Sequence, residues 1–131
     1  MDYSKSEWYK RTKEIQTAEF GAVIPPWIFS QNSHPDGIEW RMGGGESQIM
    51  VFGIWWNEKK FSEKEAIDYF KRFTPPPRWL MWMADVIWGV DVWEPEEFVN
   101  SSFYDKLTEL NFIGIQSFLS DYNDPRWAIT G

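Results

Sequence analysis

Apolar residues recur at helical spacing near the start of the chain, which predicts a first helix ending at about Thr17. Ser4 and Glu7 have the spacing of a capping box, in which a hydroxyl and a carboxylate satisfy free backbone amides at a helix start. The stripe expected to face the core consists of Trp8, Thr12 and Ile15.

The following segment, residues 22 to 37, contains three prolines and cannot form a regular helix, because each proline lacks an amide donor and favours an extended residue before it. The letters HPDG at residues 34 to 37 predict a turn. The letters IEWRM at residues 38 to 42 alternate like one short strand, with residues 22 to 24 as the only nearby pairing partner. At most a minor β element is therefore expected in this segment.

Helical periodicity returns at Glu46 and predicts a helix to about Glu58. Its apolar face consists of Ile49, Phe52 and Trp56. The most regular helix follows a second capping box, formed by Ser62 and Glu65, and extends to Thr74. Its stripe consists of Ala66, Tyr69, Phe70 and Phe73.

The triple proline at residues 75 to 77 predicts a break between helices. The helix expected from Arg78 to Trp88 is apolar nearly all round, which favours a central position, and Pro95 is expected to begin the next helical stretch. Two further short helices are predicted by the apolar residues Phe103, Leu107 and Leu110, and by Ile115, Phe118, Leu119 and Tyr122.

These elements predict a mainly α fold: a compact single domain over residues 1–131, with about six short helices and at most a minor β element near residues 22–42. A chain of this length can bury roughly two thirds of its unfolded surface, enough for a core. The alternative is an α+β domain in which the β-branched and aromatic residues 49 to 56 form a strand.

The net charge and the composition limit the classes of partner that the chain is expected to bind. The net charge of −7 argues against nucleic-acid binding, which relies on Lys and Arg, and suits a basic protein partner instead. The absence of cysteine excludes disulfides and thiolate metal sites and suits a reducing cytoplasm. The longest apolar run, residues 78 to 93, is shorter than the ~20 residues of a membrane helix and contains Asp85 and Asp91, so no membrane partner is expected.

Residues 40 to 46, with the letters WRMGGGE, form the first candidate binding loop. Consecutive glycines let backbone amides approach a ligand, and a helix starting there directs free amides at the same place, so an anion held by Arg41 is one interpretation. The alternative is a structural turn, with Arg41 stacked on a tryptophan and paired with a carboxylate, since an acidic side chain at the helix start repels an anion. The candidate binding residues are Trp27, Trp40, Arg41, Gly43, Gly44, Gly45 and Glu46.

No catalytic or metal-ligating residue is assigned, and no cofactor is expected. His34 is the only histidine, which excludes a His-rich metal site, and it is expected in an exposed turn. Asp85 interrupts an apolar helix, so a buried carboxyl there could act as a general acid. The simpler interpretation is that Asp85 pairs with Arg78 or Arg72, or faces water.

The segments IPPW and IEWRMGGGES resemble two motifs of an uncharacterised family of small bacterial proteins, Pro-Pro-Trp and Gly-Trp-Arg-Met-Gly-x-Gly-Glu. The matching positions are Pro25, Pro26 and Trp27, and Trp40, Arg41, Met42, Gly43, Gly45 and Glu46. The chain departs from the family at Glu39, where glycine is expected, and at Gln48 and Ile49, where a more polar helix start is expected. The resemblance covers residues 24 to about 80 and implies no activity. It implies that the Trp-Arg loop and the next helix form one structural unit.

We therefore expect a non-enzymatic, acidic, Trp-rich protein-interaction module in the cytoplasm, in its sharpest form a neutraliser of a basic partner of the immunity or antitoxin type. One alternative is a small-molecule binding domain or weak enzyme that holds an anionic ligand at Arg41 and the glycines. Another is a structural subunit whose tryptophans form a homodimer interface.

Overall fold

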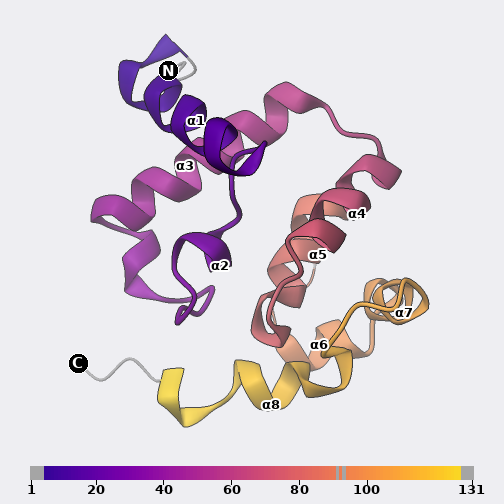
Figure 1. The fold of residues 1–131 in the computed structure, drawn as a ribbon. Coiled ribbons are helices and arrows are strands. Elements are labelled where there is room, and N and C mark those ends of the chain that lie inside the picture. The colour runs from indigo at the N-terminus through magenta and orange to yellow at the C-terminus, as the bar shows by residue number, and fades with distance from the viewer. Residues whose placement is uncertain (1–4, 91, 93, 128–131) are drawn as a thin grey trace. The chain divides into compact units, whose positions relative to one another are not determined.

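The computed structural model describes residues 5–90, 92 and 94–127 of the chain (Figure 1). These residues form eight α-helices and several short 3₁₀-helices, and no strand occurs among them, so the predicted mainly α fold is confirmed. Contacts divide the chain into two compact units, the first comprising Met1–Gln31 and Ile38–Ser62 and the second comprising Asn32–Gly37 and Glu63–Gly131. The prediction of one domain over the whole length stays a prediction.

The elements alternate with short irregular segments in both units. The first unit contains α1 (Glu7–Phe20), α2 (Pro26–Phe29), the 3₁₀-helix η2 (Ile38–Trp40) and α3 (Gly43–Lys59). The second unit contains α4 (Glu63–Arg72), η3 (Pro77–Trp79), α5 (Leu80–Trp88), α6 (Pro95–Val99), α7 (Ser102–Glu109), η4 (Ile115–Ser117), α8 (Phe118–Tyr122) and η5 (Pro125–Trp127). No helix in the described part of the chain is both long and apolar enough to cross a bilayer.

Helix α1 packs on α3 through a different stripe from the one predicted. Tyr9 and Gln16 are its buried residues, whereas Trp8 and Ile15 are 38% and 55% exposed, so the predicted stripe is wrong. The Tyr9 hydroxyl donates a hydrogen bond to Glu58 near the end of α3. Burial and this hydrogen bond raise the pKa of Tyr9, which keeps the phenol protonated as a donor. The Ser4 half of the predicted capping box lies outside the described residues.

Two buried glutamines determine how α1 faces α3. The Gln16 Nε2 donates to Gln48 Oε1 at 2.6 Å, and Gln48 Nε2 lies 3.2 Å from Gln16 Oε1. The same amides bond the backbone of Ile24, whose N–H donates to Gln16 at 3.0 Å and whose carbonyl accepts from Gln48 at 3.1 Å. Buried backbone groups need partners, and here side chains supply them. The extended residues 22 to 24 therefore need no pairing strand.

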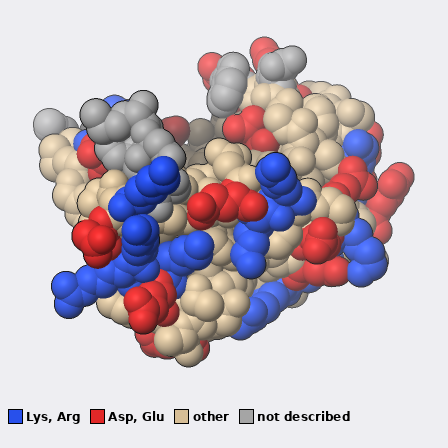
Figure 2. All heavy atoms as spheres, turned by 90° about the horizontal axis from the view of Figure 1, so that it is seen from above, with Lys and Arg blue, Asp and Glu red and all other residues tan. Residues whose placement is uncertain are grey.

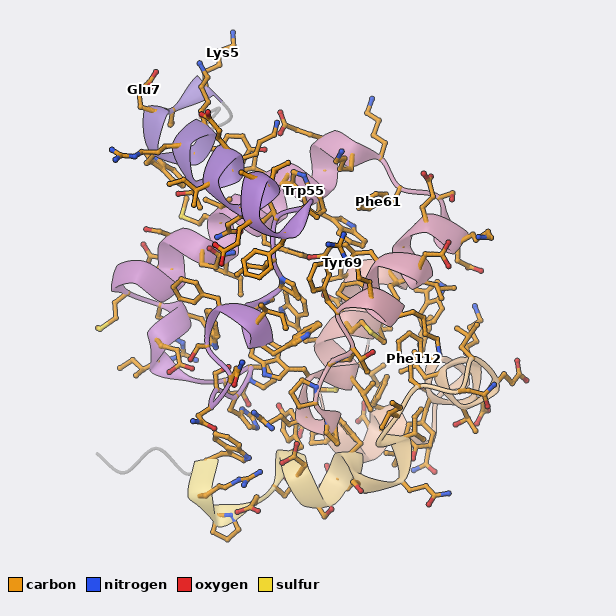
Figure 3. All side chains as sticks on the ribbon, in the orientation of Figure 1. Lys5, Glu7, Trp55, Phe61, Tyr69 and Phe112 are labelled. Carbon is orange, nitrogen blue, oxygen red and sulfur yellow. The ribbon has the colours of Figure 1, made fainter. Side chains whose placement is uncertain are left out.

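The strand predicted for residues 38 to 42 is wrong. Ile38–Trp40 is the 3₁₀-helix η2, closed by a hydrogen bond from the Arg41 N–H to the Ile38 carbonyl at 2.9 Å. Helix α3 then begins at Gly43, three residues before the predicted start, and contains the residues that the α+β alternative assigned to a strand. At its other end, Trp55 meets Phe61 in a T-shaped contact at 5.6 Å (Figure 3).

The first helices of the second unit lie where they were predicted. Helix α4 begins at Glu63, and its predicted stripe is buried at Ala66, Tyr69, Phe70 and Phe73. Pro77 then begins η3, which continues directly into α5. Only Leu80, Met83 and Ala84 of α5 are buried, so this helix is covered on one face and half-exposed on the other, not central as predicted.

The C-terminal part of the second unit is built around aromatic contacts. Helix α6 begins at Pro95 as predicted, and Phe98 packs on Phe118 of α8 with ring centroids 5.1 Å apart. Such a pair contributes about 0.5–1.5 kcal/mol beyond its buried area. Helix α8 packs against α6 and η3 (Figure 1). Gly114 before η4 has φ +83°, and a Cβ there would lie 2.6 Å from the ring of Pro77, so only glycine fits.

Candidate binding site

The predicted binding loop lies in the first unit, and its residues differ in accessibility. Trp27 and Trp40 are 3% and 8% exposed, so their rings belong to the interior. Gly45 is buried as well. The exposed members are Arg41, Gly43, Gly44 and Glu46.

Two of the three glycines have a structural reason. A Cβ on Gly45 would lie 2.0 Å from the carbonyl oxygen of Glu39, because η2 passes directly over the start of α3. Gly43 has φ +64°, a conformation that side chains rarely adopt. The geometry therefore agrees with the interpretation of the glycines as a turn. It also agrees with the expectation that the loop and the next helix form one structural unit.

Arg41 itself is not fixed by that turn. Within the described residues its guanidinium forms no ion pair, hydrogen bond or ring contact, so the predicted stacking on a tryptophan is not observed. Glu46 places a carboxylate in the first turn of α3, and the Oε1 of Glu39, in the preceding η2, is buried without a hydrogen-bond partner in the described part of the chain. Negative charge at this place opposes an anionic ligand.

A pocket of about 140 Å³ lies in the second unit. The residues of α5 that line it are Met81, Trp82 and Asp85, and the segment after that helix contributes Val90 and Val92. The turn at Pro35 and Asp36 and Tyr122 of α8 complete the lining. The lining is thus mainly apolar and includes two carboxylates.

The turn at Asp36 is fixed by His34. This histidine is only 8% exposed, so the prediction of an exposed turn residue is wrong. Its Nδ1 accepts a hydrogen bond from the Asp36 N–H at 3.0 Å, and its Nε2 lies 3.0 Å from the Tyr122 carbonyl. Both bonds require a neutral ring protonated on Nε2. The Tyr122 hydroxyl also donates to Asp36 Oδ2 at 2.8 Å, so His34 and Asp36 together link the turn to α8.

A buried ion pair also supports the turn that contains His34 and Asp36. Arg78 is 6% exposed, and its side chain donates to the Ser33 carbonyl and to Asp121 Oδ2, the latter at 3.2 Å. The Ser33 carbonyl also accepts from the indole of Trp79 at 3.1 Å. Arg78 therefore pairs with Asp121 on α8, and the predicted pairing of Arg78 with Asp85 is wrong. The guanidinium lies 4.2 Å from the ring centre of Trp127.

Charge is distributed very unevenly between the two units. The first unit contains seven acidic and seven basic residues, whereas the second contains 13 acidic and six basic residues, so the whole net charge of −7 belongs to the second unit. No Lys or Arg occurs between Arg78 and Lys106. Not every face is one-signed, because acidic and basic side chains are interspersed on the face drawn in Figure 2.

The charge around Tyr122 is negative. Burial raises the pKa of this phenol first of all, and the hydrogen bond to Asp36 and the charges of Asp36, Glu94 and Glu96 raise it further. The carboxylates of Asp36, Glu94 and Glu96 therefore make the surroundings of Tyr122 negative. Among the described residues, no group of three His, Asp or Glu side chains is arranged to hold a metal ion.

Sequence reasoning identified one residue of this pocket and missed the rest. Asp85 was a candidate because a carboxylate in an apolar helix is unusual. Asp36 and Tyr122 are 86 residues apart in sequence, so no local pattern could bring them together. The HPDG turn did predict that Asp36 lies at a bend, which was the available signal.

Comparisons with known proteins do not assign the chain to a family. No family model matches the chain, and neither a curated protein nor a solved structure matches it. The family suggested by the PPW and WRMGxGE motifs therefore stays a proposal.

Proposed function

We propose that the protein is a non-enzymatic interaction module that binds a basic protein partner in the bacterial cytoplasm. The observation that carries this proposal is the concentration of the net charge in one unit, where 13 acidic residues face only six basic ones. An acidic surface attracts a basic partner over several ångströms and raises the rate of encounter. An immunity or antitoxin protein that neutralises a basic toxin is the sharpest form of this proposal.

The tryptophans contribute less to such a surface than their number suggests. Trp27, Trp40, Trp55 and Trp79 are all buried, and Trp8 is the most accessible ring among the described tryptophans at 38% exposure. These four indoles therefore stabilise the two cores. The acidic side chains of the second unit are the more accessible recognition elements.

The alternative function, binding of an anionic ligand at the Arg41 loop, has less support than binding of a basic protein. Glu46 places a carboxylate in the first turn of the helix that would have to receive the anion. Two of the glycines are explained by the path of the chain alone.

A charge-neutralisation experiment tests the proposal. A strongly basic peptide, lysine-rich with no acidic residue, is titrated into the protein at low salt, and binding is measured by calorimetry. A triple variant with Glu94, Glu96 and Glu97 changed to Gln removes three exposed charges from α6 and its N-cap in the second unit. The matched control changes Glu7, Glu14 and Glu19 to Gln, which removes three exposed charges from α1 in the neutral first unit.

We expect the α6 variant to bind the peptide at least about fivefold more weakly than the control variant, because local charge determines the attraction. The binding should also weaken as salt is raised. Equal loss in both variants would mean that only total charge matters. No binding by the wild type at low salt would overturn the proposal.

A further inference from the structure

We propose that the pocket of the second unit receives a lysine side chain of the protein partner, with the aliphatic stem between α5 and the Val90 segment and the ammonium group at Asp85 and Asp36. This inference rests on the proposed function, because it names the group by which a basic partner is recognised. It adds a specific anchor to an otherwise diffuse charge attraction.

The size of the pocket suits this occupant. Its volume of about 140 Å³ is close to that of an engineered protein cavity that admits benzene. That is enough room for four methylenes and an ammonium group. Met81, Val90 and Val92 provide apolar contact for the stem, and the indole of Trp82 provides a ring face for a cation.

The carboxylates of the pocket lack a cation from their own unit. Asp36 accepts the Tyr122 hydroxyl, which carries no charge, and Asp85 forms no ion pair or hydrogen bond with its side chain within the described residues. Asp85 is also half-buried, so its carboxylate faces the pocket from a partly dehydrated position. An ammonium group entering there would gain charge-assisted hydrogen bonds in a site of reduced dielectric.

All six basic side chains of the second unit are engaged elsewhere. Two of them, Arg78 and Arg126, bind Asp121, and Lys64 binds Asp68. The remaining contacts are those of Lys71 with the Leu110 carbonyl, Arg72 with the ring of Phe73, and Lys106 with the ring of Trp88. The negative charge of the pocket is therefore available to a cation from outside.

A lysine fits better than an arginine. The two carboxylates come from different elements, the turn before η2 and helix α5, so in the proposed complex each contacts the ammonium group separately. A guanidinium prefers a bidentate, in-plane arrangement, whereas an ammonium group can bond carboxylates in several directions.

The test is an NMR titration of the ¹⁵N-labelled full-length chain with Nα-acetyl-lysine N-methylamide. Its neutral isostere, Nα-acetyl-norleucine N-methylamide, and the corresponding arginine derivative are titrated separately, as is n-butylammonium chloride. Binding is followed at the indole N–H resonance of Trp82, assigned by its loss in Trp82→Phe. We expect the lysine derivative to shift this resonance and the norleucine derivative to bind at least about tenfold more weakly, because it lacks the charge.

Two variants test which carboxylate of the pocket binds the ammonium group. Asp85→Asn keeps the size of the side chain and should weaken binding of the lysine derivative about tenfold, and Asp36→Asn should weaken it less, since Asp36 already accepts a hydrogen bond. The matched control is Asp68→Asn, which removes one charge from an exposed pair with Lys64 outside the pocket and should leave binding unchanged.

Several results would overturn the inference. These are equal binding of the lysine and norleucine derivatives, a preference for the arginine derivative, tighter binding of n-butylammonium than of the lysine derivative, or equal effects of Asp85→Asn and Asp68→Asn. If the basic peptide still bound the protein in a manner sensitive to the α6 carboxylates, the pocket assignment alone would be wrong and the proposed function would stand.

Discussion

Removing the carboxylate of Asp121 should destabilise the second unit more than removing any other carboxylate in it. Asp121 accepts from the backbone N–H of Arg78 at 2.9 Å, from the Arg78 Nη1 at 3.2 Å and from the Arg126 Nη2 at 3.0 Å. The side chains of Arg78 and Asp121 are only 7% and 11% exposed, whereas that of Arg126 is 60% exposed. Asp121→Ala therefore leaves a buried guanidinium without its counter-ion.

The expected loss in the free energy of unfolding follows from the exposed fractions of these side chains. Breaking a buried ion pair by removing one partner costs about 3–5 kcal/mol. The exposed Arg126 contributes at most about 1 kcal/mol of this. Arg78 keeps the Ser33 carbonyl and the Trp127 ring after the substitution, so we expect the low end, about 3 kcal/mol. For a unit of this size that corresponds to a fall in Tm of roughly 12–24 °C.

The assay is urea unfolding followed by ¹H–¹⁵N NMR, because resonances of the second unit can be read separately from those of the first. Asp68→Ala is the control, since its pair with Lys64 has side chains that are 61% and 85% exposed, and it should cost no more than about 0.5 kcal/mol. A cost below about 1 kcal/mol for Asp121→Ala would refute the reasoning that Arg78 depends on this carboxylate.

Acid provides an independent check of the same pair. Burial alone would raise the pKa of Asp121, but the hydrogen bonds and charges of Arg78 and Arg126 outweigh it and hold the pKa below its ordinary value of 3.8. A carboxyl with a lower pKa in the folded than in the unfolded state stabilises the fold fully above the unfolded value and loses that contribution as pH falls through the folded value. The free-energy difference between wild type and Asp121→Asn should therefore be constant from about pH 7 to 5 and shrink below about pH 4. A difference that stays unchanged down to about pH 3 would contradict the assignment.

Four further substitutions test the first unit. Gly45→Ala should cost more than about 2 kcal/mol, because its Cβ would collide with the backbone of η2, whereas Gly44→Ala has only a 3.8 Å neighbour and should be neutral or stabilising by up to about 1 kcal/mol, as thermal unfolding would show. Gln48→Leu removes the donor to the Ile24 carbonyl and should cost about 2 kcal/mol in urea unfolding; a cost near zero would mean that water replaces the amide. Arg41→Ala should change stability by less than about 0.5 kcal/mol by the same assay, since Arg41 is exposed, and a large loss would show that the loop is fixed by a contact of its guanidinium.

The sequence predicted those elements whose burial follows an apolar period. Helix α4 was found with its stripe because Ala66, Tyr69 and Phe70 are apolar and spaced as a helix requires. The stripe of α1 was wrong because its second buried position is the polar Gln16, whose partner Gln48 lies 32 residues away. A hydrophobic pattern cannot reveal a helix face whose buried residues are polar and hydrogen-bonded.

The candidate site was predicted only in part, for a related reason. Asp85 could be noticed because its neighbours in sequence are apolar. The roles of His34, Asp36 and Tyr122 depend on hydrogen bonds between segments 86 to 88 residues apart, which local spacing does not encode. The short strand predicted at residues 38 to 42 failed because the Glu39 carbonyl approaches the glycines of α3, a tertiary contact that favours a 3₁₀ turn.

The six residues Asn32–Gly37 belong to the second unit although both of their flanking segments belong to the first. A fragment expressed from Glu63 onward would lack the Ser33 carbonyl that Arg78 and Trp79 share and the imidazole that bonds the backbone of Tyr122. The acidic unit therefore cannot be isolated by cutting the chain once. A fragment that begins at Glu63 would need the hexapeptide added as a separate peptide, or fused to it through a new linker. Because the hexapeptide also carries Asp36, a protease that cleaved the chain after Gly37 would break the covalent link between one carboxylate of the pocket and α4 to α8, while leaving those helices on one continuous polypeptide.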